Sequence, residues 1–486
     1  MAGQMGTGVK AYWQNFINGK WVDGSTAGRI AVDNPATGEI IAEVAEATED
    51  DVNSAVAAAR ACYVSRALAR ITPAQRLQMM MRVAAYLRSH SEELAPIVVM
   101  DTGKRIRDAR GEVEMAARYF EYYGGAADKL EGTSIPLGDG FINYTVHCPF
   151  GVSAQIVPWN YPLIIAARSV SAAFATGNAT VVKVPELAPL SVYALAEACA
   201  AAGFPPGAVN IICGYGQTAG AALAGHRDVN QLVFTGSVQT GQAILHSAAE
   251  RVVPCVMELG GKSAGVVFPD ADIKDVLDSA RAGIFQHAGQ VCSAMSRLVV
   301  HESRYDEVVS SVAEMAESLR IGAGIDDHDI TPVISAGQLD RVEGYCLGAV
   351  QQGAVAVTGG RRAGNRDGYF MPPTVIADVT AGMTIANEEV FGPVLAILKY
   401  DTPEQAIAIA NGTDYGLAAG VFTRDVARSH WAAAALEAGQ VYVNQWHAGG
   451  VETPFGGMKK SGFGREKGQE ALMNYVQTKS VTLRVG

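Results

Sequence analysis

Cysteine is sparse in this sequence, and the few cysteines present form no ordered pattern. There are seven, an odd number, and none belongs to a CxxC pair or to a Cys/His cluster. A disulfide framework usually needs an even set of cysteines, and a zinc site needs clustered ligands. The sequence therefore predicts reduced thiols in a cytoplasmic protein, and no metal site.

Long hydrophobic runs and an excess of positive charge are also missing. The longest apolar candidate, residues 156–174, contains Asn160, Arg168 and two prolines, so it does not suit a membrane helix. The first residues lack the charged region and apolar core of a secretory signal. The formal net charge is -11, whereas nucleic-acid binding requires a basic surface. We therefore predict no membrane and no nucleic-acid partner.

The composition is that of a folded protein with more than one domain. Hydrophobic residues make up 49% of the chain and charged residues 18%, which is typical of globular proteins and not of disordered ones. The length of 486 residues exceeds what one hydrophobic core usually holds. We expect two or more domains.

The order of apolar patterns predicts an α/β architecture. Residues 49–123 have apolar positions at helical spacing and predict a block of helices. Residues 128–148 alternate like an extended arm, a kind of segment that often pairs with another subunit. From residue 151 to 268, short apolar runs, among them Val252–Met257, alternate as predicted strands with alanine-rich segments, and the rhythm repeats from 273 to about 440. This alternation indicates parallel sheets covered by helices.

Two turns after predicted strands are candidates for dinucleotide binding. Lys183 and Glu186 follow a strand, at the sheet edge where parallel strands bind ligands. A carboxylate there accepts both ribose hydroxyls of adenosine and repels a 2′-phosphate, which favours NAD over NADP. The alternative is a solvated ion pair. Gly236 and Ser237 join a strand to a helix, whose free N–H groups suit a pyrophosphate, although the spacing is not GxGxxG.

Three residues in glycine- or proline-broken turns predict the chemistry. Cys292 lies in a loop of small residues, Glu258 precedes a Gly-Gly break, and Asn160 lies between two prolines. They supply a thiol nucleophile, a carboxylate that burial turns into a general base, and an amide donor for an oxyanion. Plainer alternatives are an inert thiol, a carboxylate that caps the break and a turn asparagine. As a set, they suit the oxidation of an aldehyde through a thioester.

Several ordered motifs give the chain a resemblance to the aldehyde dehydrogenase superfamily. They are Val157–Pro162 (VPWNYP), Lys183 with Glu186, Phe234–Ser237 (FTGS), Glu258–Lys262 (ELGGK), Gly289–Cys292 (GQVC), Glu388–Val394 (EEVFGPV) and Pro454–Gly457 (PFGG). These motifs extend over nearly the whole chain from Phe16 onward. The resemblance implies an α/β fold with two Rossmann-type domains and a β-arm for oligomerisation.

The resemblance also implies domain limits and a homo-oligomer. It places an NAD-binding domain at residues 1–128 and 148–258 and a catalytic domain at 259–460. Residues 129–147 and 461–486 would form the oligomerisation arm and the C-terminal segment. Because members of the superfamily are dimers or tetramers, we expect a homodimer or a homotetramer.

The same resemblance implies a role for each motif residue. It makes Cys292 the nucleophile, Glu258 the base for water and Asn160 the oxyanion donor. The residues that it implies for NAD, with NADP as the alternative, are Ile156, Pro158, Trp159, Lys183, Glu186, Gly236, Ser237, Leu259, Glu389 and Phe391. The residues that it implies for the substrate are Tyr161, Arg168, Val291, Ser293, Trp446 and Phe455.

The choice of substrate depends on Arg168 and Ser169, which stand where many members have Trp-Lys, so the usual lysine for a proton relay is absent. The run 167–170 is similar to that of benzaldehyde-type dehydrogenases, but succinate-semialdehyde dehydrogenases also have an arginine here. A tunnel arginine would donate to a phenol oxygen or a carboxylate, unless a neighbouring carboxylate already pairs with it. We predict an aromatic aldehyde, of the hydroxylated benzaldehyde type, with an aliphatic semialdehyde as the alternative.

Three other function classes stay open. An acylating enzyme would pass the thioester to coenzyme A, and Glu258, the base for hydrolysis, argues against it. A thiol esterase would use the same cysteine without NAD. A structural or binding protein would need none of the three residues.

Overall fold

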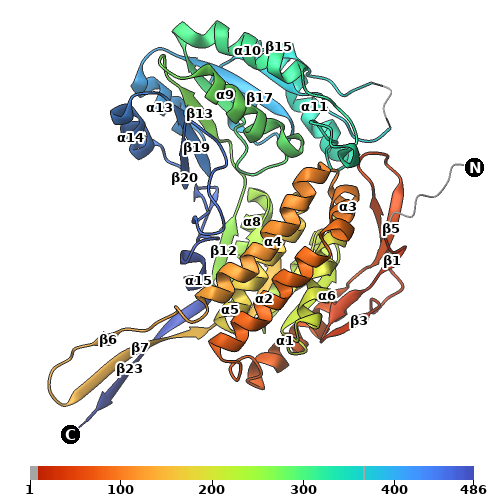
Figure 1. The fold of residues 1–486 in the computed structure, drawn as a ribbon, viewed down its shortest axis with the longest axis vertical. Helices are drawn as coiled ribbons and strands as arrows, with labels where there is room; N and C mark the ends of the chain where they lie inside the picture. The colour runs from red at the N-terminus through yellow and green to blue at the C-terminus, as the bar shows by residue number, and fades with distance from the viewer. Residues whose placement is uncertain (1–8, 365–366, 486) are drawn as a thin grey trace, which may run out of the picture.

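Two α/β units and an extended arm make up the protein (Figure 1). The structure is a computed structural model that describes residues 9–364 and 367–485. It confirms the predicted α/β fold, and all seven cysteines are free. Among the described residues, no helix combines the length and the apolar character that crossing a membrane requires.

The first unit is built on an eight-stranded sheet. In spatial order its strands are β22 (Gly462–Phe463), β12 (Cys255–Glu258), β11 (Gln231–Thr235), β8 (Val152–Ile156), β9 (Ala179–Val184), β10 (Val209–Cys213), β2 (Asn15–Ile17) and β3 (Lys20–Val22). The strands from β12 to β10 run parallel, and β22, β2 and β3 are antiparallel to their neighbours. Their residues are nearly all buried, as parallel strands between helical layers require.

Helices cover this sheet on both faces. They are α1 (Glu49–Val64), α2 (Pro73–Ser89), α3 (Ser91–Thr102), α4 (Ile106–Ala126), α5 (Pro162–Thr176), α6 (Tyr193–Ala201), α7 (Ala221–Gly225) and α8 (Val238–Ala249). The first four fill the predicted helical block, and Thr48 and Thr72 begin α1 and α2 with capping boxes. A small sheet flanks the unit, in the order β1 (Tyr12–Trp13), β5 (Ile40–Ala45) and β4 (Arg29–Asp33).

One predicted strand of this unit starts later than expected. The apolar run from Val252 to Met257 suggested a strand, but β12 begins only at Cys255. Val252 has a φ of 56° and is 88% exposed, so it belongs to the turn that follows α8. Pro254, which lacks a backbone N–H, then separates the turn from the strand.

The second unit repeats the α/β design around a seven-stranded sheet. In spatial order its strands are β15 (Val355–Thr358), β16 (Thr374–Val379), β17 (Val394–Tyr400), β14 (Arg297–His301), β13 (Ala264–Val267), β19 (Ala418–Phe422) and β20 (Gln440–Val443). Only β15 is antiparallel to its neighbour. The helices are α9 (Ile273–Ala280), α10 (Tyr305–Glu317), α11 (Ala336–Gln351), α12 (Thr384–Asn387), α13 (Pro403–Asn411) and α14 (Val426–Ala435).

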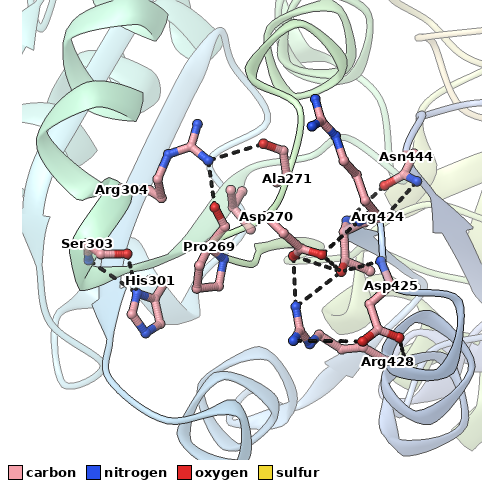
Figure 2. A network of polar contacts seen from close by, with 12 residues as sticks. Pro269, Asp270, Ala271, His301, Ser303, Arg304, Arg424, Asp425, Arg428 and Asn444 are labelled. Carbon is pink, nitrogen blue, oxygen red and sulfur yellow. Dashed lines mark hydrogen bonds and ion pairs between the residues drawn. The ribbon is translucent and has the colours of Figure 1, made fainter.

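A polar network at one end of this sheet ties the loop after β13 to the start of α14 (Figure 2). The carboxylate of Asp270 accepts hydrogen bonds from Thr423 Oγ1 at 2.9 Å and from Arg428 Nη1 at 2.8 Å. It also accepts the backbone N–H of Arg424 at 3.1 Å. Every oxygen of this carboxylate therefore has a partner.

The arm consists of two long antiparallel strands that project from the body (Figure 1). Strand β7 (Phe141–Pro149) pairs along its whole length with β23 (Val476–Arg484), and β6 (Ser134–Ile135) pairs with β7. Of the predicted C-terminal segment, only β23 joins the arm. Strand β22 joins the first sheet, and α15 (Glu470–Met473) packs on α5. The short antiparallel pair of β18 (Tyr415–Gly416) and β21 (Met458–Lys459) joins the segment before β19 to the segment before β22.

Candidate active site

A cavity of about 200 Å³ lies between the two units and brings nine of the nineteen predicted site residues together. Its lining includes Pro158, Trp159, Asn160, Gly236, Ser237, Glu258, Cys292, Glu389 and Phe391. Residues that the sequence analysis missed also line it: Thr235, Gly260, Gln338 and Arg341. The first unit contributes the carboxyl ends of β8, β11 and β12, where a parallel sheet presents its ligand site. A much larger cavity, of about 860 Å³, lies apart from these residues beside α3.

Cys292 is held at the cavity by backbone packing that only glycine permits. The loop passes through positive φ at His287, Ala288 and Gly289. A Cβ on Gly289, whose φ is 70°, would lie 2.1 Å from the carbonyl oxygen of Gly392. A Cβ on Gly261 would lie 2.7 Å from the carbonyl oxygen of Cys292. The loop that carries Cys292 is thus fixed between two other loops of the cavity.

The Cys292 thiol is protonated at neutral pH in this structure. Burial raises its pKa to about 12, and the carboxylates of Glu389 and Glu258 act in the same direction. Arg168 and a hydrogen bond with the backbone of Ser293 act against them. A base must therefore take the proton when the sulfur attacks a substrate.

Glu258 is a carboxylate without partners. It ends β12 and is 2% exposed, and neither of its oxygens has a hydrogen bond among the described residues. Burial raises its pKa well above the ordinary value, although the positive charge of Arg168 opposes the shift. A buried carboxylate in this state can accept a proton inside the cavity.

Asn160 presents an amide to the cavity from the turn before α5. Its Nδ2 donates to the carbonyl oxygen of Gln290 at 2.9 Å, and its own backbone oxygen accepts from Lys104 Nζ at 3.0 Å. An amide nitrogen has two N–H groups, so one remains for a ligand. The arrangement suits an oxyanion donor.

The predicted nucleotide residues occupy three separate turns. Lys183, at the end of β9, forms an ion pair of 2.8 Å with Glu186, whose side chain is 32% exposed. Ser237 is the N-cap of α8, and Gly236 next to it lines the cavity. Ile156 ends β8, while the backbone N–H of Leu259 donates to Ser461. Gly236 and Ser237 thus bring the N-terminus of α8 to the cavity, and a helix N-terminus suits an anion.

Glu389 and Phe391 close the cavity from the second unit. Glu389 Oε1 accepts the backbone N–H of Gly261 at 3.1 Å, and burial raises its pKa to about 7. The ring of Phe391 lies edge-on to Trp159, with centroids 5.3 Å apart. Lys262, which the sequence analysis did not single out, is 2% exposed, has no hydrogen bond from its Nζ among the described residues, and has a pKa that burial lowers to about 7.

Arg168 differs from the expectation that placed it in a substrate tunnel. Its Nε lies 2.7 Å from Glu466 Oε2, and both side chains are buried. Its Nη2 donates to Thr235 Oγ1 at 3.3 Å. The guanidinium is therefore engaged by a neighbouring carboxylate, which is the alternative that the sequence left open.

Four of the remaining predicted substrate residues lie beside Cys292 or Asn160, and the fifth, Phe455, precedes Gly456, which packs against Glu258. Ser293 bonds through its hydroxyl to His447 Nε2 at 3.3 Å, and Trp446 Nε1 donates to the Ser293 carbonyl at 3.0 Å. Tyr161 packs edge-on against His287, with centroids 5.3 Å apart. Val291 and Phe455 are half-buried, and Lys467 Nζ lies 5.8 Å from the Phe455 ring centre. Nothing in the sequence indicated that His447 would lie at the site, apart from its position next to the predicted residue Trp446.

Comparisons with known proteins agree over almost the whole chain. The model of the aldehyde dehydrogenase family matches residues 21–481. An aldehyde dehydrogenase of Aspergillus niger is 42% identical over 97% of this chain and 95% of its own length. The mitochondrial aldehyde dehydrogenase of Homo sapiens is 41% identical over 97% and 92% of the two chains. The solved NAD+ complex of a Bacillus cereus aldehyde dehydrogenase has a TM-score of 0.96 and 40% identity, and the match covers 98% of this chain and 97% of that one.

Proposed function

The chain belongs to the aldehyde dehydrogenase family of oxidoreductases, and from this premise we propose that it oxidises an aldehyde to the carboxylic acid through a thioester on Cys292. The observation that carries the proposal is the meeting of Cys292, Glu258 and Asn160 at one cavity. These side chains are a nucleophile, an unpartnered base and an amide donor.

NAD is the cofactor, as in the solved Bacillus cereus relative. The residues present fit it. Glu186 is a partly exposed carboxylate at a strand end, and the N-terminus of α8 opens into the cavity beside Gly236 and Ser237. We assign the adenosine ribose to Lys183 and Glu186, the pyrophosphate to Gly236 and Ser237, and the nicotinamide ribose and ring to Glu389 and Phe391. When bound, NAD supplies the acceptor for the hydride that leaves the substrate carbon.

The side chains divide the reaction between them. As the sulfur of Cys292 bonds to the aldehyde carbon, Glu258, the cavity carboxylate that has no hydrogen bond among the described residues, accepts the thiol proton and releases it to solvent before the hydrolysis step. The carbonyl oxygen becomes an oxyanion, which the free N–H of Asn160 stabilises; such a donor contributes about 3 kcal/mol. After oxidation, Glu258 deprotonates the water that hydrolyses the thioester, and the acid leaves.

An aromatic aldehyde is the substrate class that the surroundings of Cys292 favour. Tyr161, Trp446 and Phe455 supply aromatic side chains on the segments next to Asn160, Ser293 and Glu258. The charge of Arg168 is already balanced by Glu466, which pairs with it. A semialdehyde with a carboxylate is the second candidate, favoured by Lys467, a cation beside the Phe455 ring.

The arm supports a homodimer or a homotetramer. Its exposed apolar side chains include Ile135, Leu137, Phe141, Ile142, Tyr144, Val146 and Leu483. An antiparallel ribbon with so many apolar side chains in water is unfavourable in a monomer and suits burial against a second copy.

The test is NADH formation by the wild type and by Cys292→Ala. The wild type should reduce NAD with aromatic aldehydes, without coenzyme A, at a higher kcat/KM than with succinate semialdehyde, and intact mass should show a transient acyl adduct. Cys292→Ala should lose at least about 10³-fold in kcat. NADH formation that survives this substitution would contradict the thioester route. Ester hydrolysis without any NADH would instead point to a thiol esterase.

A further inference from the structure

Two fully buried side chains hold the turn that carries Asn160. Lys104, between α3 and α4, forms an ion pair with Glu112 of α4, and neither side chain is exposed to solvent. Lys104 Nζ also donates to the backbone oxygen of Asn160 at 3.0 Å and lies 3.9 Å from the ring centre of Tyr161. Glu112 Oε1 accepts the backbone N–H of Ile164 at 3.3 Å. Both charges are thus used by one short stretch of chain.

The start of α5 depends on this pair. Among the described residues, α5 has no side-chain N-cap of its own, and Pro162 and Leu163 open it. Glu112 provides the missing acceptor, and its negative charge complements the positive end of the helix dipole. Lys104 neutralises Glu112 and at the same time fixes the carbonyl two residues before the helix.

Stability alone does not account for a buried ion pair. Removing two charges from water costs about as much as their attraction returns, and apolar residues of equal volume often stabilise a core as well or better. The pair instead orients the turn, because Lys104 holds the backbone carbonyl of Asn160 from one side. The Asn160 side chain is fixed from the other side by the carbonyl of Gln290, and Gln290 Oε1 is itself anchored by the backbone N–H of Ile334 at 2.8 Å.

We propose that Lys104 and Glu112 are positioning residues that aim the free amide N–H of Asn160 at the oxyanion. The proposal rests on the proposed function. An oxyanion donor acts only within about 2.7–3.1 Å of the oxygen, and a displacement of about 1 Å of a catalytic group can cost about 100-fold in rate. Without the pair, the turn can rotate, and the amide N–H of Asn160 no longer points at the oxyanion.

The experiment compares the same change with and without Asn160. Lys104→Met/Glu112→Gln removes both charges, so that no unpaired charge is buried, and it keeps an acceptor for Ile164. We expect single-turnover NADH formation to slow by about 10- to 100-fold in the Asn160 background. In the Asn160→Ala background, the same double change should have no further effect, because the group being positioned is absent.

Two further variants guard against a purely structural effect. Lys104→Arg keeps the charge but shifts the donor, and it should show a smaller loss of NADH formation that again disappears with Asn160→Ala. Arg428→Met breaks an ion pair of the second unit and should change the melting temperature alone. The alkylation rate of Cys292 and the affinity for NAD should stay the same in all the Lys104 variants.

The outcomes separate the two proposals. An unchanged single-turnover rate, or a loss of equal size in the Asn160→Ala background, overturns the positioning role. If Lys104→Met/Glu112→Gln does not fold, Lys104→Arg decides by the same criterion. A wild type that forms no NADH with any aldehyde overturns the proposed function instead.

Discussion

Two carboxylates at the ends of consecutive strands of different sheets have opposite surroundings. Asp270 follows β13, is partly exposed, and accepts hydrogen bonds from Thr423, Arg424 and Arg428 (Figure 2). Glu258 ends β12, is buried, and has no hydrogen bond at either oxygen among the described residues. Asp270 thus uses both oxygens in hydrogen bonds of the fold, whereas Glu258 is available to a ligand or a proton.

The pKa values of the two groups follow from these surroundings. Burial works to raise the pKa of Asp270, but the Thr423 hydroxyl, nearby backbone N–H groups and the Arg428 charge outweigh it, and the pKa is lowered. For Glu258, burial dominates and raises the pKa well above the usual range. Asp270 therefore stabilises the fold as an anion, whereas the ionised form of Glu258 destabilises it. A destabilising group that the fold retains is what a catalytic base requires.

Glu258→Gln changes the carboxylate that the fold leaves unpaired, and it should have the largest effect on kcat. Glutamine has the same shape but cannot accept the proton of a thiol or of water. We expect kcat to fall by about 10²- to 10⁴-fold, the usual contribution of a general base. Steady-state NADH formation measures the loss, and intact mass should detect an acyl adduct on Cys292 that persists longer than in the wild type. A kcat within a few-fold of wild type would assign the base to another group.

The same substitution should stabilise the protein, and increasingly so as the pH rises. Because the folded pKa of Glu258 is raised, the folded state holds the proton to higher pH than the unfolded state does. The wild type therefore loses stability as the pH rises from the unfolded pKa toward the folded one. Glutamine avoids this loss, and the gain at pH 8 should be about 1–3 kcal/mol, the cost of an unsatisfied buried group. Melting temperatures of both proteins at pH 5 and pH 8 check it, and a difference that is equal at the two pH values would contradict it.

Much of the fold and the site followed from the sequence because the signals are local. Runs of apolar and β-branched residues predicted the parallel strands, and Glu258, Gly236 and Asn160 stand at the end of such a strand or within four residues after it. Carboxyl ends of parallel strands meet at one edge of the sheet, so these residues meet as well. Local pattern misjudged the start of β12, where Val252 has a positive φ, and it grouped residues 264–268 with the first α/β stretch, whereas β13 belongs to the second sheet.

The rest of the site depends on partners far apart in the chain. Arg168 pairs with Glu466, and Lys104 reaches Asn160 from the segment between two helices. Neither contact follows from spacing or periodicity, because the partners meet only when the tertiary structure forms. The sequence therefore points to the groups that we propose for the chemistry, but not to those that we propose to orient them.

Asp270→Asn changes the carboxylate that the fold uses in hydrogen bonds, and it should have the smallest effect, a small loss of stability. Asparagine keeps an acceptor for Thr423 but loses the charge that Arg428 binds. Since the Arg428 and Asp270 side chains are 33% and 35% exposed, water screens the pair, and the free energy of unfolding should fall by only about 1 kcal/mol. Urea denaturation at pH 7 measures it, and kcat should not change, because Asp270 does not line the cavity. The difference should disappear in acid, as the pH falls through the lowered pKa of Asp270 and the wild type loses its charge too. A loss of kcat with unaltered stability would mean that this network, and not only the cavity, serves the reaction.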